Sequence, residues 1–190
     1  MDPSNYQVTA TLADGSAITI RAIHPEDRQC FAEAFEEFAK SPDSVHFRFH
    51  GFKRSLSQDE AIRMTEVDFV DHVALVATFG DQPESPLIGV GRYIVCPAPK
   101  RHRAEVAFAV LDKHQGKGIG SLVLQHLTSI ARAQGLREFE AEVLADNHPM
   151  IGVLEGSGFP IQLSTEFGVA RVLLTIADQS QPKEHSSDRQ

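Results

Sequence analysis

The stretch that decides the fold reads Gln115-Gly116-Lys117-Gly118-Ile119-Gly120-Ser121. It lies between a segment of strand character, residues 104–111, and a long apolar segment, residues 119–133. The three glycines remove the β-carbons that would hold a ligand away from the backbone. The start of the following helix leaves about four backbone N–H groups unpaired and carries a partial positive charge. The stretch therefore predicts a phosphate-binding loop, to which Lys113 and Lys117 add positive charge.

Alternative roles for the glycine loop are weaker or remain open. A plain glycine-rich turn with a glycine N-cap is one alternative. A Walker loop is excluded, because the sequence has no Gly-Lys-Ser/Thr. A dinucleotide loop fits poorly, because the third glycine, Gly120, comes one residue early. Glu140 does lie about twenty residues further on, where a ribose-binding acid is expected, so a nucleotide-binding oxidoreductase stays a minor alternative.

Regular patterns extend outward from the loop in both directions. Asp14-Gly15 predicts a hairpin between two strands, and Pro25 opens a helix whose apolar face we expect in the core. Ser57 and Glu60 form a capping box at the start of a second helix. The predicted strands are residues 6–12, 17–22, 73–79, 87–95, 104–111, 139–144 and 169–176. The predicted helices are residues 25–40, 58–67, 119–133 and 150–155. The apolar face of the helix 25–40 consists of Phe31, Ala34, Phe35 and Phe38. This order predicts an α+β fold with a mixed sheet and helices on both faces.

The composition is that of an ordinary globular protein. The chain has 190 residues, 42% hydrophobic and 23% charged, which suits one domain with a sizeable core. We expect this domain over residues 1–177, and a disordered tail over 178–190, which has no large apolar side chain. No apolar run approaches the roughly 18–20 residues of a membrane span, and the first residues do not resemble a secretory signal. Two cysteines are too few for a disulfide framework, so we expect a reducing cytoplasm.

The net negative charge of the chain argues against some classes of partner. The net charge is −8, whereas nucleic-acid binders need a basic surface, so nucleic acid is not expected. An anionic small ligand is still compatible, because backbone N–H groups can hold it. His46 and His50 have helical spacing, but no H-E-x-x-H pattern or cysteine partner accompanies them, so no metal is predicted.

Three motifs in order resemble those of the GCN5-related N-acetyltransferases. Gln115-x-x-Gly118-x-Gly120 is similar to the Q/R-x-x-G-x-G/A signature of that family, and Asn147-x-x-Met150 with Gly158-Phe159 is similar to its downstream motif. The resemblance covers roughly residues 16–176. It implies a mixed sheet whose fourth and fifth strands splay apart to admit acetyl-CoA.

Within that family, the sequence is similar to the acetyltransferase domain of bacterial Pat-type protein lysine acetyltransferases. Ser41-Pro42-Asp43-Ser44, Arg48-Phe49 and residues 66–77 carry this similarity. Those proteins often add a nucleotide-binding or acyl-CoA-synthetase-like domain, for which these 190 residues have no counterpart. Both a protein lysine and a small amine therefore stay open as acceptors.

The resemblance implies roles for individual residues. The cofactor-binding residues are Phe108, Val110, Gln115, Gly116, Lys117, Gly118, Gly120, Ser121 and Asn147. Residues 115–121 would hold the pyrophosphate, and the backbone N–H of Val110 would donate to the thioester carbonyl. Asn147 would contact the pantetheine arm or position the acceptor. His114, beside the loop, either touches phosphate or caps the helix.

Glu105 is the candidate general base. It stands in an otherwise apolar strand, and alternation places it on the same side as Ala107 and Ala109, whose small side chains leave room for a ligand. Partial burial would raise the pKa of its carboxyl toward the working pH. The resemblance also implies a glutamate base here, acting directly or through a water. The alternative is a surface carboxylate paired with Arg103.

The position of a general acid is occupied by an apolar residue. Many members of the family have a tyrosine seven residues after the motif asparagine, where this chain has Leu154. Either water protonates the departing thiolate or it leaves as the anion, since free thiols have a pKa of about 8.5. The sequence therefore predicts direct acetyl transfer from acetyl-CoA to an amine, by a monomer or a homodimer. The alternative is a non-catalytic acyl-CoA-binding sensor module.

Overall fold

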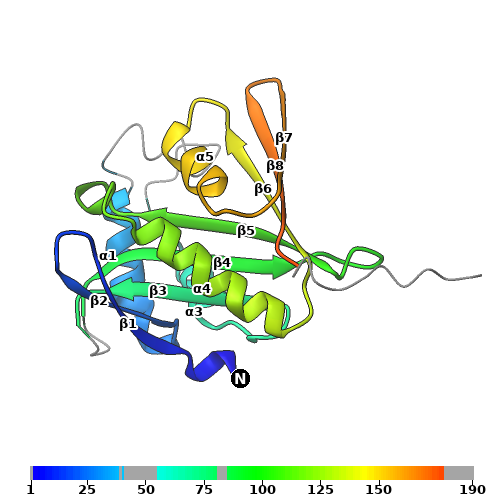
Figure 1. Cartoon of the computed structure of the whole chain (residues 1–190). Helices are drawn as coiled ribbons and strands as arrows, with labels where there is room; N and C mark the ends of the chain where they lie inside the picture. Colours follow the sequence, from blue (N-terminus) through cyan, green and yellow to red (C-terminus); the bar gives the residue numbers. More distant parts are fainter. Residues whose placement is uncertain (1, 39, 41–54, 81–84, 178–190) are drawn as a thin grey trace, which may run out of the picture.

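The computed structural model describes residues 2–38, 40, 55–80 and 85–177. These residues form one eight-stranded sheet in the order β1-β2-β3-β4-β5-β6-β8-β7 (Figure 1). The strands are β1 (Gln7–Thr11), β2 (Ala17–Ala22), β3 (His72–Thr78), β4 (Leu87–Val95), β5 (Arg103–Val110), β6 (Glu138–Leu144), β7 (Ile161–Glu166) and β8 (Val169–Thr175). The helices are α1 (Arg28–Phe38), α3 (Gln58–Thr65), α4 (Ile119–Ala133) and α5 (His148–Glu155). The tail predicted at 178–190 lies outside the described residues.

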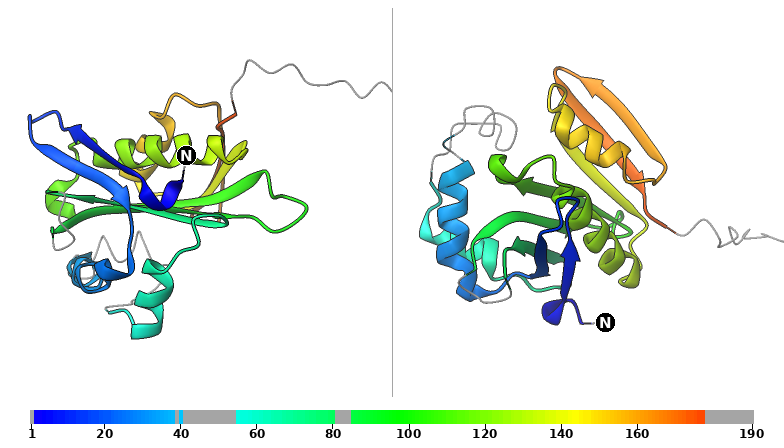
Figure 2. Two further views of the ribbon diagram at one scale, coloured as in Figure 1. Left: turned by 90° about the horizontal axis from the view of Figure 1, so that it is seen from below. Right: turned by 60° about the vertical axis from the view of Figure 1, so that its left-hand side comes forward.

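The sheet is mixed, as the sequence predicts. Its neighbouring strands are antiparallel except β5 and β6, which run parallel. Helices α1 and α3 lie on one face, and α4 and α5 on the other (Figure 2). The main core lies between the sheet and α4, and a smaller one lies under α1. The α+β class with helices on both faces is confirmed.

Helix α4 packs directly on β4 because β4 contains two glycines. A β-carbon at Gly91 would lie 2.3 Å from Val123 Cγ1, and one at Gly89 would lie 3.2 Å from Ile119 Cγ2. Both helix residues are buried, at 1% exposure. The glycines of β4 therefore set the distance between the sheet and the helix that follows the loop.

Local signals in the sequence account for most element boundaries. Gly15 in the β1–β2 turn has φ +83, a conformation that glycine accepts readily. The capping box of α3 is present: Ser57 Oγ accepts from the Glu60 N–H at 3.3 Å, and the Glu60 carboxylate accepts from the Ser57 N–H at 2.9 Å. The predicted apolar face of α1 is buried along its whole length. Residues 41–54, which follow the predicted helix 25–40, lie outside the described residues.

One strand is absent from the sequence-based prediction. Strand β7 pairs with β8 from Ile161↔Leu174 to Glu166↔Val169, at one edge of the sheet. All of its residues after Ile161 are exposed. Alternating burial is the signal that reveals a strand in a sequence, and β7 buries too little to produce it. Among the described helices, none has the length and apolar character needed to span a membrane.

Candidate active site

The sheet opens between β5 and β6. Only three residue pairs join these strands: Arg103↔Glu138, Ala104↔Phe139 and Glu105↔Glu140. The ladder ends at Glu105, and Figure 1 shows β5 and β6 diverging. The opening expected between a fourth and a fifth strand is therefore found between the fifth and the sixth strand of this chain.

A cleft of about 920 Å³ occupies this opening. It reaches both faces of the sheet, because β5 has no neighbour on that side beyond Glu105. One end lies at the glycine loop and α5, and the other lies under α1. The lining includes Gly116, Gly118, Gly120, Ser121, Asn147 and Met150 at the first end, Phe31, Phe35, Phe38, Met64 and Arg92 at the second, and residues 105–110 between them.

The glycine loop is shaped to approach a ligand. Gly116 and Gly118 have φ 74 and 86, and a β-carbon built on either meets no atom within 4 Å. The first backbone hydrogen bond of α4 runs from the Leu122 N–H to the Gly118 carbonyl. The N–H groups of residues 119–121 precede it and point out of the helix start. The loop residues therefore fit the pyrophosphate of acetyl-CoA.

Side chains of the loop are held by the protein itself. Gln115 Nε2 donates to the Val110 carbonyl at 3.2 Å and to Asp112 Oδ1 at 2.9 Å. Lys117 Nζ forms an ion pair with Asp14 Oδ2 at 2.9 Å, in the β1–β2 turn. Both contacts hold side chains of the loop in place. Gln115, Gly116 and Gly118 line the cleft, whereas Lys117 does not.

His114 adds a polar atom at the loop. Its ring packs edge-on against Phe79, with the centroids 5.2 Å apart. Its buried Nδ1 has no hydrogen-bond partner within the described residues, and burial lowers the pKa of the imidazole. An orphaned polar atom in a cleft wall is consistent with a polar ligand supplying the missing partner.

Glu105 lies where the opening begins. It pairs with Ile94 on one side and Glu140 on the other, and alternation places it on the same face as Ala107, as predicted. Its side chain is exposed, so the prediction of partial burial is wrong. The expected alternative partner, Arg103, instead binds Glu138 at 2.7 Å and Glu140 at 3.0 Å. The carboxylate of Glu105 forms no hydrogen bond or ion pair within the described residues.

Asn147 and Leu154 belong to α5 and its cap. Asn147 is the N-cap residue, and its Oδ1 accepts from the Met150 N–H at 3.2 Å. It lines the cleft near the glycine loop. Leu154 is fully buried in the main core. The position that carries tyrosine in many relatives therefore serves packing in this chain.

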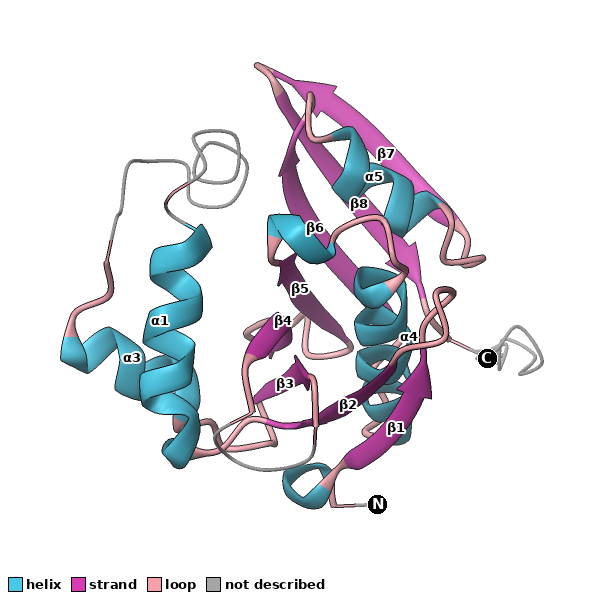
Figure 3. Cartoon of the chain, turned by 90° about the vertical axis from the view of Figure 1, so that its left-hand side faces the viewer, coloured by secondary structure: helices cyan, strands magenta, loops and turns pink. Residues whose placement is uncertain are grey.

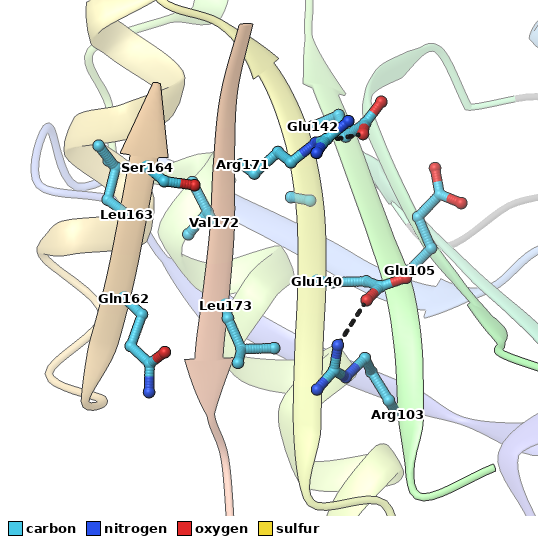
Figure 4. A pocket seen from close by; sticks show the side chains of 11 residues that line it. Arg103, Glu105, Glu140, Glu142, Gln162, Leu163, Ser164, Arg171, Val172 and Leu173 are labelled. Atoms are coloured by element: carbon cyan, nitrogen blue, oxygen red, sulfur yellow. Dashed lines mark hydrogen bonds and ion pairs between the residues drawn. The ribbon is translucent and has the colours of Figure 1, made fainter. Parts of the chain in front are cut away.

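A second hollow, the shelf, lies on the open face of β6, β8 and β7. It measures about 640 Å³ and lies on the face opposite the core under α4, in which Phe139 and Val143 of β6 pack. Figure 3 shows α5 on that core side, in front of β7 and β8. Ion pairs Glu140–Arg103 at 3.0 Å and Glu142–Arg171 at 3.1 Å cross it (Figure 4). Glu105 and Glu142 line both the shelf and the cleft, so the shelf adjoins the cleft at these side chains.

Residues 27–159 match the model of the Acetyltransferase (GNAT) family. The chain belongs to this family. It is therefore an N-acetyltransferase, and the GNAT family uses acetyl-CoA as its acetyl donor. The dinucleotide-loop alternative is wrong, because Glu140 is bound to Arg103 on the face of the sheet away from the loop.

Several GNAT proteins are similar along most of this chain. Acetyltransferase PA5475 of Pseudomonas aeruginosa is 28% identical over 149 residues, 78% of each chain. The crystal structure of the GNAT domain of S. lividans PAT has a TM-score of 0.80 and 35% identity, over 89% of this chain and 96% of that one. Acetyltransferase Pat of Mycolicibacterium smegmatis is 31% identical over 76% of this chain, which spans 41% of that protein.

Some residues of the cleft were not identified from the sequence. Arg92 and Met64 line its α1 end, and Glu142 lines the border with the shelf. The apolar face of α1 was assigned to the core, and its phenylalanines also form a wall of the cleft. No motif marks these positions, because strand pairing alone brings β4 beside β5. Within the described residues no cluster of potential metal ligands occurs; His46 and His50 lie outside them.

Proposed function

We propose that this GNAT protein moves the acetyl group of acetyl-CoA directly to an amine, with Glu105 as the general base. The position of Glu105 carries the proposal: its carboxylate, unpaired within the described chain, stands where the sheet opens, between the cleft and the shelf. A general base must come within hydrogen-bonding reach of the proton that it removes. An amine that enters from the shelf meets this carboxylate before it reaches the cleft.

The chain's own residues supply binding and orientation. The N–H groups of residues 119–121 and the backbone of Gly116 and Gly118 would hold the pyrophosphate. The backbone N–H of Val110 would donate to the thioester carbonyl. Acetyl-CoA, when bound, supplies an activated acetyl thioester. Glu105 would accept the proton that the amine loses, directly or through one water.

The departing thiolate receives no tyrosine proton in this proposal. Leu154 is buried, and the two tyrosines of the chain lie elsewhere: Tyr93 is buried and its hydroxyl donates to Gln134, and Tyr6 contacts His126. Neither tyrosine lines the cleft. The thiolate therefore leaves as the anion or takes a proton from water, which its pKa of about 8.5 allows.

A protein lysine is the favoured acceptor, and a small amine is the alternative. The similarity to proteins named Pat supports a protein substrate. The shelf supports it as well, since an open sheet face can accept a polypeptide segment. A cytoplasmic location and a monomeric or homodimeric state remain predictions from the sequence.

The test is thiol release from acetyl-CoA by the purified protein. The acceptors are small amines and a candidate protein substrate, an acyl-CoA synthetase. Glu105→Gln should lower kcat at least about tenfold, because general-base catalysis contributes roughly 10²–10⁴-fold, with little change in the Kd for acetyl-CoA. Glu166→Gln is the matched control, because Glu166 is exposed on the same sheet, outside the cleft.

Two results would contradict the proposal. An unchanged kcat in Glu105→Gln would remove Glu105 as the base. Acetyl-CoA binding without thiol release, whichever amine is supplied, would favour the non-catalytic sensor.

A further inference from the structure

Arg92 is the notable charged group at the α1 end of the cleft. Among the described arginines and lysines, only Arg92 lines the cleft. It lies on β4 opposite Ala107 of β5, and its side chain is half-buried between the sheet and the two helices above it. Figure 3 shows α1 and α3 on this side of the sheet.

Arg92 has no carboxylate partner within the described chain. Its Nη1 donates to Met64 Sδ at 2.8 Å and lies 3.2 Å from His72 Nε2, and its Nη2 donates to the Met64 carbonyl at 3.4 Å. Its Cζ lies 5.7 Å from the centre of the Phe31 ring. These partners are a thioether, an imidazole, a carbonyl and an aromatic ring, and none carries a negative charge.

Another arginine on the same side of the sheet shows the usual arrangement. Arg21 is buried on β2, and its two terminal nitrogens bind the two oxygens of Asp27 at 2.8 and 2.7 Å. A desolvated charge is costly unless an opposite charge accompanies it. The charge of Arg92 is partly desolvated, and no described carboxylate offsets the free-energy cost as Asp27 does for Arg21.

The local electrostatics leave Arg92 charged. Burial lowers the pKa of its guanidinium to about 10, well above neutral pH. Burial and the charge of Arg92 lower the pKa of His72 to about 4, so His72 is neutral at pH 7. A guanidinium has five N–H donors in a planar fork that matches a carboxylate, and the contacts of Arg92 do not satisfy all of them.

Arg92 and Glu105 lie on one face of adjacent strands. Arg92 pairs with Ala107, and Glu105 is two residues away along β5. Such diagonal neighbours are about 7–8 Å apart. The small side chain of Ala107 lies beneath the space between them, and the phenylalanines of α1 form its wall. The space therefore has an anionic group at one end and a cationic group at the other.

We infer that Arg92 binds a carboxylate of the acceptor while Glu105 faces the amine, so the preferred acceptor carries a carboxylate near the amine that is acetylated. This inference rests on the proposed function. The carboxylate has two possible sources: a free amino acid, or an acidic residue beside a lysine in a polypeptide. A bidentate guanidinium–carboxylate contact would recognise both alike.

The experiment compares acceptors that differ only in that charge. One arm uses amino acids against their carboxamides, and the other uses lysine peptides with a neighbouring glutamate against the same peptides with glutamine. The wild type should prefer the carboxylate member of at least one arm by about tenfold or more in kcat/KM, as expected for a charged hydrogen bond. The arm that shows the preference identifies the source.

Variants assign the preference to Arg92. Arg92→Gln should raise the KM for the carboxylate acceptor about tenfold, and kcat/KM should fall far more on the carboxylate acceptor than on its neutral counterpart. Arg92→Lys keeps the charge without the fork, so it should retain part of the preference, and it also serves if the glutamine variant does not fold. Arg101→Gln, on an exposed arginine that is paired with Asp71, is the control.

A binding measurement separates this inference from the proposed function. With CoA present, the carboxylate acceptor should raise the Tm of the wild type and not that of Arg92→Gln, whether or not turnover occurs. A wild type that treats both members of every pair alike would overturn the inference. An equal loss on both members in a folded Arg92 variant would overturn it as well, because that result assigns Arg92 to structure alone.

Discussion

Two glycine pairs with the spacing G-x-G have opposite surroundings in this protein. Gly89 and Gly91 lie in β4, and the space a β-carbon would need there is filled by α4. Gly116 and Gly118 lie in the loop before α4, and the corresponding space there is empty. The same G-x-G spacing thus serves close packing in one place and access to the backbone in the other.

The difference lies in the backbone and its surroundings. The loop glycines have φ 74 and 86, in the left-handed region, whereas the β4 glycines have ordinary strand conformations. A side chain is excluded from β4 by atoms of the protein. In the loop it is disfavoured by backbone strain and by the space that a ligand needs. Substitutions can test each cause separately.

The largest effect on stability is expected at β4. A β-carbon in Gly91→Ala would lie 2.3 Å from Val123 Cγ1, so the Val123 side chain, α4 or β4 must shift. Overpacking of this kind costs about 1–3 kcal/mol in the free energy of unfolding. Urea denaturation followed by circular dichroism measures it, and a variant as stable as the wild type would contradict the packing role of the β4 glycines.

The next effect concerns binding. Gly118→Ala should weaken acetyl-CoA binding about tenfold, because a methyl group would stand in front of the N–H groups that hold phosphate. Its φ of +86 should also cost roughly 1 kcal/mol in stability. Isothermal titration calorimetry gives the Kd.

A matched control exists at the other end of the same helix. Gly135 has φ +85 and open space around it, but it does not line the cleft. Gly135→Ala should therefore lower stability by a similar amount and leave the Kd for acetyl-CoA unchanged. Equal Kd values in the two variants would show that the loop glycines serve turn geometry alone.

The smallest effect is expected at the contact between the loop and the β1–β2 turn. Asp14→Asn removes the exposed ion pair with Lys117, and exposed pairs contribute little, so acetyl-CoA affinity should change less than about twofold. Hydrogen bonds from Ser16 and Lys117 lower the pKa of Asp14 from its ordinary value of 3.8. A lowered pKa means that the carboxylate stabilises the fold above about pH 4 and loses this contribution at lower pH.

Thermal unfolding of both proteins across pH 2–7 checks the sign of that contribution. If the wild type has a higher Tm than Asp14→Asn, the difference in Tm should be present at neutral pH and should decrease as the pH falls. An advantage that grows toward acid would contradict the assignment.

Much of the fold follows from local signals in the sequence. The Asp14-Gly15 turn, the Ser57–Glu60 capping box and the phenylalanine face of α1 each occur where predicted. Each of these depends on residues within one turn or one helix face. Strand β7 was not predicted, because backbone pairing with β8 holds it at an exposed edge of the sheet. Such a strand does not need alternating apolar residues.

The site was less predictable than the fold. The loop and Glu105 were identified from spacing and resemblance, and both line the cleft, except for Lys117 of the loop. The exposure of Glu105 was not foreseen, because it depends on which part of the sheet face the helices leave uncovered, and local sequence patterns do not indicate that. Arg92 was missed for a similar reason. Its proposed role depends on the lack of a carboxylate partner among the described residues, and no sequence pattern indicates such a lack.

The short ladder between β5 and β6 also has a consequence for hydrogen exchange. Along residues 106–109, backbone amides that face β4 are held by strand pairing, whereas those that face the cleft have no strand beside them. We expect their protection factors to alternate along β5, with exchange at the cleft-facing amides limited only by solvent access. Saturating acetyl-CoA should remove this alternation, and the residue at which it begins would locate the end of the ladder in solution.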